Sequence, residues 1–267
     1  MKPTDLSPVS EAAIRAALPE KYRDLQIFVY DTTDSTNTRA EIFAREGGTE
    51  AVFVAREQTA GRGRRGRSFV SGRDLGLYIS FLLGRRESAE TALSLTTYSA
   101  VALSRTVERL FGARPSIKWV NDIYLGERKL AGILTTGQVS EDGQGLDFAV
   151  VGIGVNILGR DFPSEIRDIA TSLEREGYGG VSLPDFAAAF IDEFYSSLHL
   201  VGEREITEEY RSRQMLTGRR VTVERAGESF TAEVLGVSDS CALRLRLDGG
   251  EEIDLSTGEV SVHTAEG

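Results

Sequence analysis

The sequence predicts an α+β fold followed by a small all-β domain, and three observations lead to this prediction. Apolar stretches with strand character alternate with helical patterns between residues 27 and 215. From residue 217 onward only short strands remain, separated by turns rich in Gly, Asp and Ser. Hydrophobic residues make up 40% of the 267 residues, which is sufficient for a substantial core.

The same change of pattern divides the chain into parts. We expect a short N-terminal extension over residues 1–26, a main domain over 27–217 and a small C-terminal domain over 218–267. The last part reads as a β-barrel similar to an SH3 barrel. One short helix after Ser10 is expected in the extension, and a single helix is too little for a helix-turn-helix domain.

Each element of the main domain follows from a local pattern. Strands are expected from β-branched and aromatic runs at residues 27–30, 51–55, 75–83, 116–120, 123–125, 129–134 and 148–157. Helices are expected at residues 38–46, 91–111, 186–200 and 203–215. Thr38 to Glu41 fits a capping box that would begin the first of these helices. In the C-terminal domain, strands are expected at residues 221–223, 230–237, 243–247, 252–255 and 260–262.

Net charge makes one local cluster unusual. The formal charge is −10 and the pI is about 4.9, a poor profile for a nucleic-acid binder. Yet Gly61 to Arg67 contains four arginines and three glycines between two apolar strands. Glycines let backbone N–H groups turn toward a ligand, and arginines supply forked donors for oxyanions. A small anionic ligand, a solvated basic loop and a short nucleic-acid patch are the alternatives, and the acidic background disfavours the last.

Several kinds of chemistry are disfavoured by what the chain lacks. Cys241 is the single cysteine, so no intramolecular disulfide exists, and its alternating surroundings predict a strand residue rather than a nucleophile. The two histidines, His199 and His263, do not have metal-ligand spacing. The N-terminus has no apolar signal region, and no run of 18 apolar residues occurs. We therefore expect a soluble, cytoplasmic protein.

Further polar or glycine-bearing stretches interrupt the predicted strands. They are Ser35 to Asn37, Lys118 to Asp122, Lys129 to Gly132, and the glycine pair Gly152 and Gly154. Each has a structural explanation: a lead-in to a helix, outward-facing lysines, a plain turn, or strand bulges. Their occurrence together favours one ligand site.

These stretches resemble the motifs of biotin protein ligases. The matching segments are Asp34-Ser35-Thr36-Asn37, Gln58 with Gly61 to Arg67, Lys118-Trp119-Val120-Asn121-Asp122, Arg128 to Ile133, Gly152 to Asn156 and Ala170 to Leu173. Their order and spacing agree with that family over roughly residues 27–262. One departure is Val120, which stands where the family usually has proline. The resemblance implies a class II synthetase-like mixed sheet with helices on one side, and an SH3-like C-terminal domain.

The resemblance also implies a reaction and its site. Biotin and ATP would form biotinyl-5′-adenylate, whose biotinyl group passes to a lysine of a biotin carboxyl carrier domain. Catalytic roles fall to Lys129, Arg62 and Arg64. The residues expected around biotin are Ser35, Thr36, Asn37, Gln58, Gly61, Arg62, Gly63, Arg64, Lys129 and Gly132. Those expected to bind ATP are Arg67, Lys118, Asn121, Asp122 and Asn156, with Asp122 also a ligand of Mg²⁺.

Other expectations concern partners and rival functions. We expect no DNA and no membrane partner. Oligomeric state stays open, although the strand at residues 149–157 is expected to offer an edge for a homodimer. Trp119 is expected in the core, and Arg65 in solvent. A lipoate ligase of the same fold and a non-catalytic biotin-binding protein are the alternatives; the arginine-rich loop favours biotin, and Lys129 with Asp122 favours an enzyme.

Overall fold

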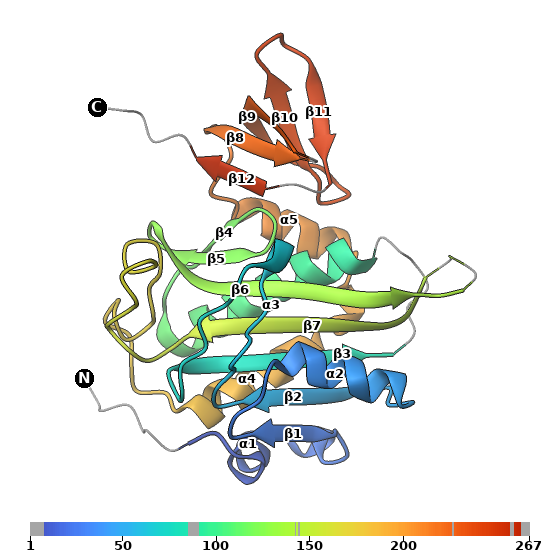
Figure 1. Ribbon diagram of the computed structural model, residues 1–267, viewed down its shortest axis with the longest axis vertical. Coiled ribbons are helices and arrows are strands. Elements are labelled where there is room, and N and C mark those ends of the chain that lie inside the picture. The colour runs from blue at the N-terminus through green and yellow to red at the C-terminus, as the bar shows by residue number, and fades with distance from the viewer. Residues whose placement is uncertain are drawn as a thin grey trace.

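The computed structural model describes residues 8–84, 91–141, 143, 145–225, 227–256 and 259–262. A mixed sheet with helices forms the larger part of the molecule, and a separate antiparallel sheet lies at one end (Figure 1). This arrangement confirms the predicted α+β fold with a C-terminal all-β unit. His263 falls outside the described residues. Within them, no helix combines the length and apolar character needed to span a membrane.

The larger sheet has seven strands in the order β1-β2-β3-β7-β6-β5-β4. It is mixed, because β1 and β2 run parallel while the other neighbours are antiparallel. The strands are β1 (Ile27–Tyr30), β2 (Ala51–Ala55), β3 (Gly76–Leu83), β4 (Ser116–Lys118), β5 (Asp122–Leu125), β6 (Arg128–Val139) and β7 (Leu146–Asn156).

The expected free edge at residues 149–157 is wrong. β7 lies inside the sheet, where residues 149–156 pair with β3 and residues 146–155 pair with β6. Its backbone groups are therefore used within the chain and cannot pair with a second copy. The apolar run that suggested an edge is typical of a strand buried on both faces.

Helices cover both faces of this sheet, because successive side chains of a strand point to opposite sides. Val52 and Val54 of β2 belong to the larger core, whereas Ala51 and Phe53 belong to a smaller one. The larger core is covered by α1 (Glu11–Ala17), α3 (Thr91–Phe111), α4 (Leu183–Ser196) and α5 (Arg204–Ser212). α2 (Thr36–Arg45) covers the smaller core on the opposite face (Figure 1). The prediction of helices on one side of the sheet is therefore right for α1, α3, α4 and α5 and wrong for α2.

α2 begins two residues earlier than expected, and its capping box is absent. The carboxylate of Asp34 accepts from the Ser35 backbone N–H at 2.6 Å and from Nε of Arg39 at 2.9 Å. Burial raises the pKa of Asp34, but these hydrogen bonds outweigh it and hold the pKa below its ordinary value. The carboxylate of Glu41 does not bond to the start of the helix. It accepts instead from Arg62 of the arginine-rich loop and from Thr136 of β6.

The C-terminal sheet has five antiparallel strands in the order β11-β10-β9-β8-β12. They are β8 (Arg220–Arg225), β9 (Glu228–Val237), β10 (Leu243–Leu247), β11 (Glu252–Leu255) and β12 (Glu259–Val262). Each predicted strand is present. Cys241, however, does not lie in a strand: it is buried in the turn before β10, with φ of 62°.

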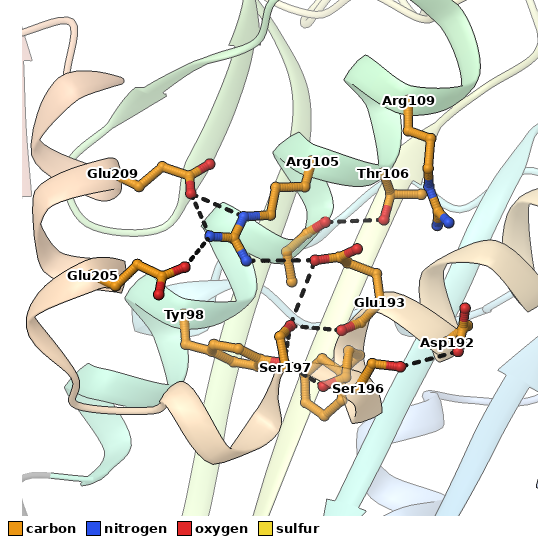
Figure 2. A network of polar contacts seen from close by, with 12 residues as sticks. Tyr98, Arg105, Thr106, Arg109, Asp192, Glu193, Ser196, Ser197, Glu205 and Glu209 are labelled. Carbon is orange, nitrogen blue, oxygen red and sulfur yellow. Dashed lines mark hydrogen bonds and ion pairs between the residues drawn. The ribbon is translucent and has the colours of Figure 1, made fainter. Parts of the chain in front are cut away.

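A polar network joins the three helices α3, α4 and α5 (Figure 2). Nη2 of Arg105 lies 2.6 Å from Glu209 and 3.1 Å from Glu205, and Nη1 lies 3.7 Å from Glu193. Arg213 also pairs with Glu209, at 2.7 Å. Burial raises the pKa of Glu209, but hydrogen bonds from the two arginines outweigh it, and the pKa falls below its ordinary value of 4.5.

This network predicts an acid-dependent loss of stability. A carboxyl whose pKa is lower in the folded state stabilises the fold above its unfolded pKa and loses that effect as pH falls through the folded pKa. Glu209→Gln should therefore lower the free energy of unfolding at pH 7 by about 1–2 kcal/mol, and the difference should shrink as pH falls below 4.5. Denaturant unfolding at several pH values measures this.

The matched control is Glu205→Gln on the same helix, whose side chain is 62% exposed and should contribute little. Equal losses for the two variants, or a Glu209→Gln loss that does not change with pH, would contradict the account.

Candidate functional site

The arginine-rich loop connects β2 to β3, and an ion pair closes its base. Nε and Nη2 of Arg56 donate to the two carboxylate oxygens of Asp74 at 2.9 and 2.7 Å. The backbone N–H of Asp74 also donates to the carbonyl of Arg56 at 2.9 Å. The hydrogen bonds from Arg56 lower the pKa of Asp74. Both ends of the loop are thus held together where it leaves the sheet.

The loop borders a cavity of about 380 Å³. The sequence-predicted residues that line it are Ser35, Thr36, Asn37, Gln58, Arg62, Gly63, Arg64, Arg67, Lys118, Asn121, Asp122, Lys129 and Gly132. Gly61 and Asn156 do not line it. Gly152, Ile153 and Gly154, whose backbone was expected to let a ligand approach, also line it. Residues that line it without having been assigned to the site are Arg65, Ser68, Phe69, Trp119, Tyr124, Ile133, Leu134, Ile169 and Val260.

Lys129 and Asp122 form an ion pair at the centre of the predicted site. Nζ of Lys129 lies 2.7 Å from Oδ1 of Asp122, although the contact lacks the alignment of a hydrogen bond. Asp122 pairs with Gly132 across β5 and β6. A Cβ on Gly132 would lie 3.2 Å from Nζ of Lys129. The absence of a side chain at Gly132 therefore provides space for the Lys129 amine.

Positive charge dominates the cavity wall. Its lining includes the six basic side chains of Arg62, Arg64, Arg65, Arg67, Lys118 and Lys129. The carboxylate among the lining residues is that of Asp122. Burial, together with Asp122, raises the pKa of the lining residue Tyr124 to about 12, so its hydroxyl stays protonated at neutral pH. The cavity is therefore suited to ligands with more than one negative charge.

A hydrogen-bonded cluster occupies the N-terminus of α2. Oε1 of Gln58 accepts from the backbone N–H of Thr36 at 2.8 Å and from its hydroxyl at 3.1 Å. Oγ of Ser80, on β3, lies 2.8 Å from Oγ1 of Thr36 and 2.7 Å from Oδ1 of Asn37. Ser80 is fully buried and was missed, because it lies within an otherwise apolar strand. The polar groups expected around biotin are thus oriented by one another.

The two glycines of β7 make room for side chains of this site. A Cβ on Gly152 would lie 1.7 Å from Oδ1 of Asn37. A Cβ on Gly154 would lie 2.5 Å from the ring of Phe69, which belongs to the loop. These are close approaches of a ligand-site residue to the backbone, as the sequence suggested, and not strand bulges.

Residues from the C-terminal part of the chain hold the segment that carries Asp122. The indole N–H of Trp119 donates to the carbonyl of Cys241 at 3.0 Å, and the hydroxyl of Tyr210 donates to the carbonyl of Val120 at 3.0 Å. The peptide bond between Trp119 and Val120 is cis. Trp119 is 4% exposed, as expected of a core residue, yet one side of it lines the cavity.

Asn121 connects this segment to the loop. Its Nδ2 donates to the carbonyl of Ile133 at 2.8 Å, and its Oδ1 accepts from Nη1 of Arg64 at 3.2 Å. Arg65, expected in solvent, lines the cavity, and its Nη2 lies 3.4 Å from the carbonyl oxygen of Glu224 in the C-terminal sheet. The loop is therefore in contact with both sheets.

Asn156 and Gly61 lie beside the cavity and not in its wall. Nδ2 of Asn156 donates to the carbonyl of Thr171 at 3.0 Å, and the Thr171 N–H donates to the carbonyl of Lys129 at 2.9 Å. Asn156 thus supports the chain next to Lys129; contact with ATP stays a prediction. A Cβ on Gly61 would lie 2.4 Å from the carbonyl oxygen of Phe69. Glycine at this position therefore allows the two sides of the loop to approach each other at Gly61 and Phe69.

The packing of Gly152 yields a direct prediction. Gly152→Ala should lower the free energy of unfolding by about 1–3 kcal/mol, because the new methyl group cannot coexist with Asn37 in its present position. Asn37 cannot move freely, since it is bonded to Ser80 and to the carbonyl of Leu134. Denaturant unfolding measures the loss.

The control for this prediction is Gly249→Ala, at a glycine with open space around its Cβ position. Its stability should stay close to that of the unsubstituted protein. An unchanged Gly152→Ala variant would show that Asn37 is not confined as described.

Comparison with known proteins agrees with this geometry. The model of the biotin/lipoate A/B protein ligase family matches residues 29–156, and that of the biotin protein ligase C-terminal domain matches residues 216–262. The biotin–[acetyl-CoA-carboxylase] ligase of Paracoccus denitrificans is 34% identical over 232 residues, 83% of this chain and 94% of that protein.

Two further relatives extend the comparison. The bifunctional ligase/repressor BirA of Bacillus subtilis (strain 168) is 30% identical over 91% of this chain and 76% of its own length. The structure of biotin protein ligase from Aquifex aeolicus in complex with biotin and ATP matches with a TM-score of 0.76 and 26% identity, over 90% of this chain and 99% of that one. On these matches, the chain belongs to the biotin protein ligase family.

Proposed function

We propose that this chain activates biotin with ATP as biotinyl-5′-adenylate and transfers the biotinyl group to a lysine of a biotin carboxyl carrier domain. The observation that carries the proposal is the cavity in which Lys129 and Asp122 lie 2.7 Å apart among basic side chains. Related proteins named biotin–[acetyl-CoA-carboxylase] ligases, and a similar structure holding biotin and ATP, support it.

The uncharged end of biotin is assigned to the cluster at the start of α2. Ser35, Thr36, Asn37 and Gln58 present hydroxyl and amide groups that match the ureido ring and can replace its hydration. Gly132 leaves space for the ligand beside Lys129, and Gly61 and Gly63 give the loop its path around the ligand. Because these polar groups are already oriented before biotin binds, little conformational entropy is lost on binding, which favours both affinity and selectivity.

The first step requires two anions to meet. The carboxylate oxygen of biotin attacks the α-phosphorus of ATP; an O–P bond forms, the bond to the bridging oxygen breaks, and pyrophosphate leaves. Lys129 is a compact positive charge that can contact the carboxylate and the α-phosphate together. Arg62 and Arg64, which line the cavity, offset the charge of the activated carboxyl end. A well-placed donor of this kind is worth roughly 3–4 kcal/mol in a transition state.

The nucleotide phosphates are assigned to other polar residues of the cavity lining. The residues proposed to bind them are Arg67, Lys118, Asn121 and Asp122. Asp122 also fits a ligand of Mg²⁺, because a buried carboxylate oxygen without an aligned hydrogen bond is present there. Mg²⁺ needs only one or two protein carboxylates when phosphate oxygens complete its shell. When bound, the ion would lower the negative charge of the phosphates; the residues above align them.

The second step transfers the biotinyl group. An amine of the carrier lysine attacks the carbonyl carbon of the adenylate; a C–N bond forms, the C–O bond of the mixed anhydride breaks, AMP leaves with the electron pair and the amine loses a proton. No protein nucleophile is required, which agrees with the buried Cys241. The loop excludes water from the reactive anhydride until the carrier arrives.

We propose no DNA partner for this protein. The formal charge of −10 opposes binding to DNA. We propose the cytoplasm as the site of the reaction. A homodimer is still open, but one that uses residues 149–157 as a free edge is not proposed, since β7 is paired on both sides.

Incubation with biotin, ATP, Mg²⁺ and a purified biotin carboxyl carrier domain tests the function. Intact-mass measurement should find one biotinyl group added to the carrier, and none when ATP is omitted. A parallel reaction with lipoate and a lipoyl domain separates the rival ligase, which the same family model includes. Modification of the lipoyl domain alone would assign the chain to lipoate. Biotin binding without any product would assign it to the non-catalytic class.

A further inference from the structure

An ion pair between a lining residue of the cavity and a residue outside that lining ties the arginine-rich loop to α2. Nη1 of Arg62 lies 3.0 Å from Oε1 of Glu41. The hydroxyl of Thr136, on β6, donates to the same oxygen at 2.8 Å. A single carboxylate oxygen therefore joins the loop, the helix and the sheet.

The surroundings of Glu41 fit a fixed anchor better than a solvated surface charge. Its side chain is 17% exposed, whereas that of Arg62 is 41% exposed. Thr136 belongs to a long central strand, so its hydrogen bond fixes the carboxylate independently of the loop. A guanidinium carries five N–H groups, and one bond to Glu41 leaves others that can reach a ligand in the cavity.

The loop needs an anchor of opposite charge near its tip. Four arginines lie within the seven residues from Gly61 to Arg67, and like charges at this spacing repel one another. The ion pair of Arg56 with Asp74 holds the base of the loop, not its tip. Backbone hydrogen bonds within the loop join Gly63 to Arg67 and Phe69 to Gly61. Arg64 and Arg65 reach uncharged oxygens of Asn121 and Glu224 in other elements, whereas Glu41 gives Arg62 a carboxylate.

We propose that Glu41 is a positioning residue for the biotin reaction: it holds Arg62, and with it the loop, over the cavity, and so slows the escape of biotinyl-adenylate. The inference rests on the proposed function, since it takes biotin and its adenylate as the ligands. Glu41 acts through Arg62 and does not contact the substrate in this account.

The experiment measures the release of the intermediate. Protein is loaded with tritium-labelled biotin, ATP and Mg²⁺, then chased with unlabelled biotin. Glu41→Ala should release label roughly three- to tenfold faster, as expected for the loss of a partly exposed charged hydrogen bond. The KM for biotin should rise by a similar factor, kcat for pyrophosphate release should fall less than it does in Arg62→Ala, and the thermal unfolding midpoint of the unliganded protein should change little.

Two further variants separate positioning from general packing. Glu46→Ala removes an exposed carboxylate at the C-terminal end of the same helix and should leave release unchanged. Arg62→Ala should also speed release, and the double variant with Glu41→Ala should be no faster than Arg62→Ala alone. Rate increases that multiply in the double variant, or a lower unfolding midpoint for Glu41→Ala, would assign Glu41 to the packing of α2 and overturn the proposal.

Failure of this inference is distinct from failure of the proposed function. Unchanged release from Glu41→Ala, with label retained by the unsubstituted protein, would overturn the role of Glu41 alone. If the unsubstituted protein retains no labelled biotin under these conditions, the biotin-ligase function fails and the role of Glu41 fails with it.

Discussion

The basic side chains around the cavity repel one another, and the fold must hold them together against this repulsion. Six cationic side chains and one carboxylate line the cavity. Asp122 offsets Lys129 at the centre, and Glu41 offsets Arg62 at the margin. Such an arrangement stores binding energy for anionic ligands, because their arrival relieves repulsion that the folded chain already bears.

The supports of the site come from distant parts of the chain. The base of the loop is closed by Arg56 and Asp74, which flank it in sequence. The segment around Asp122 is held by Tyr210 and by the turn at Cys241, whose contacts span 90 and 122 residues of sequence. The C-terminal sheet therefore has a physical role in the site: its turn fixes Trp119, and its carbonyl at Glu224 accepts from Arg65.

Much of the fold and most of the site could be predicted from local patterns. Strand periodicity located every strand, and the glycine-arginine loop and the lysine-bearing strands contain residues that do converge on one cavity. Long-range contacts could not be predicted, because nothing local distinguishes Ser80 in an apolar strand or Glu41 in a helix. Glu41 was read as part of a capping box, whereas tertiary contact with Arg62 decides its place.

Two other errors have the same origin. Cys241 follows an alternating pattern but lies in a turn, where its carbonyl accepts from Trp119. Residues 149–157 look like an edge strand only until their partners on both sides are known. For Cys241 and for residues 149–157, the position in the fold depends on contacts with distant parts of the chain, and the local pattern does not contain that information.

Pyrophosphate release by Lys129→Ala, with biotin and ATP present, tests the central claim most directly. If Lys129 joins the biotin carboxylate to the α-phosphate, release should fall by about a hundredfold or more, while the variant remains folded and Lys129→Arg retains part of the rate. Near-normal release from folded Lys129→Ala would contradict the account, because the charge at the centre of the cavity would then have no part in forming the adenylate.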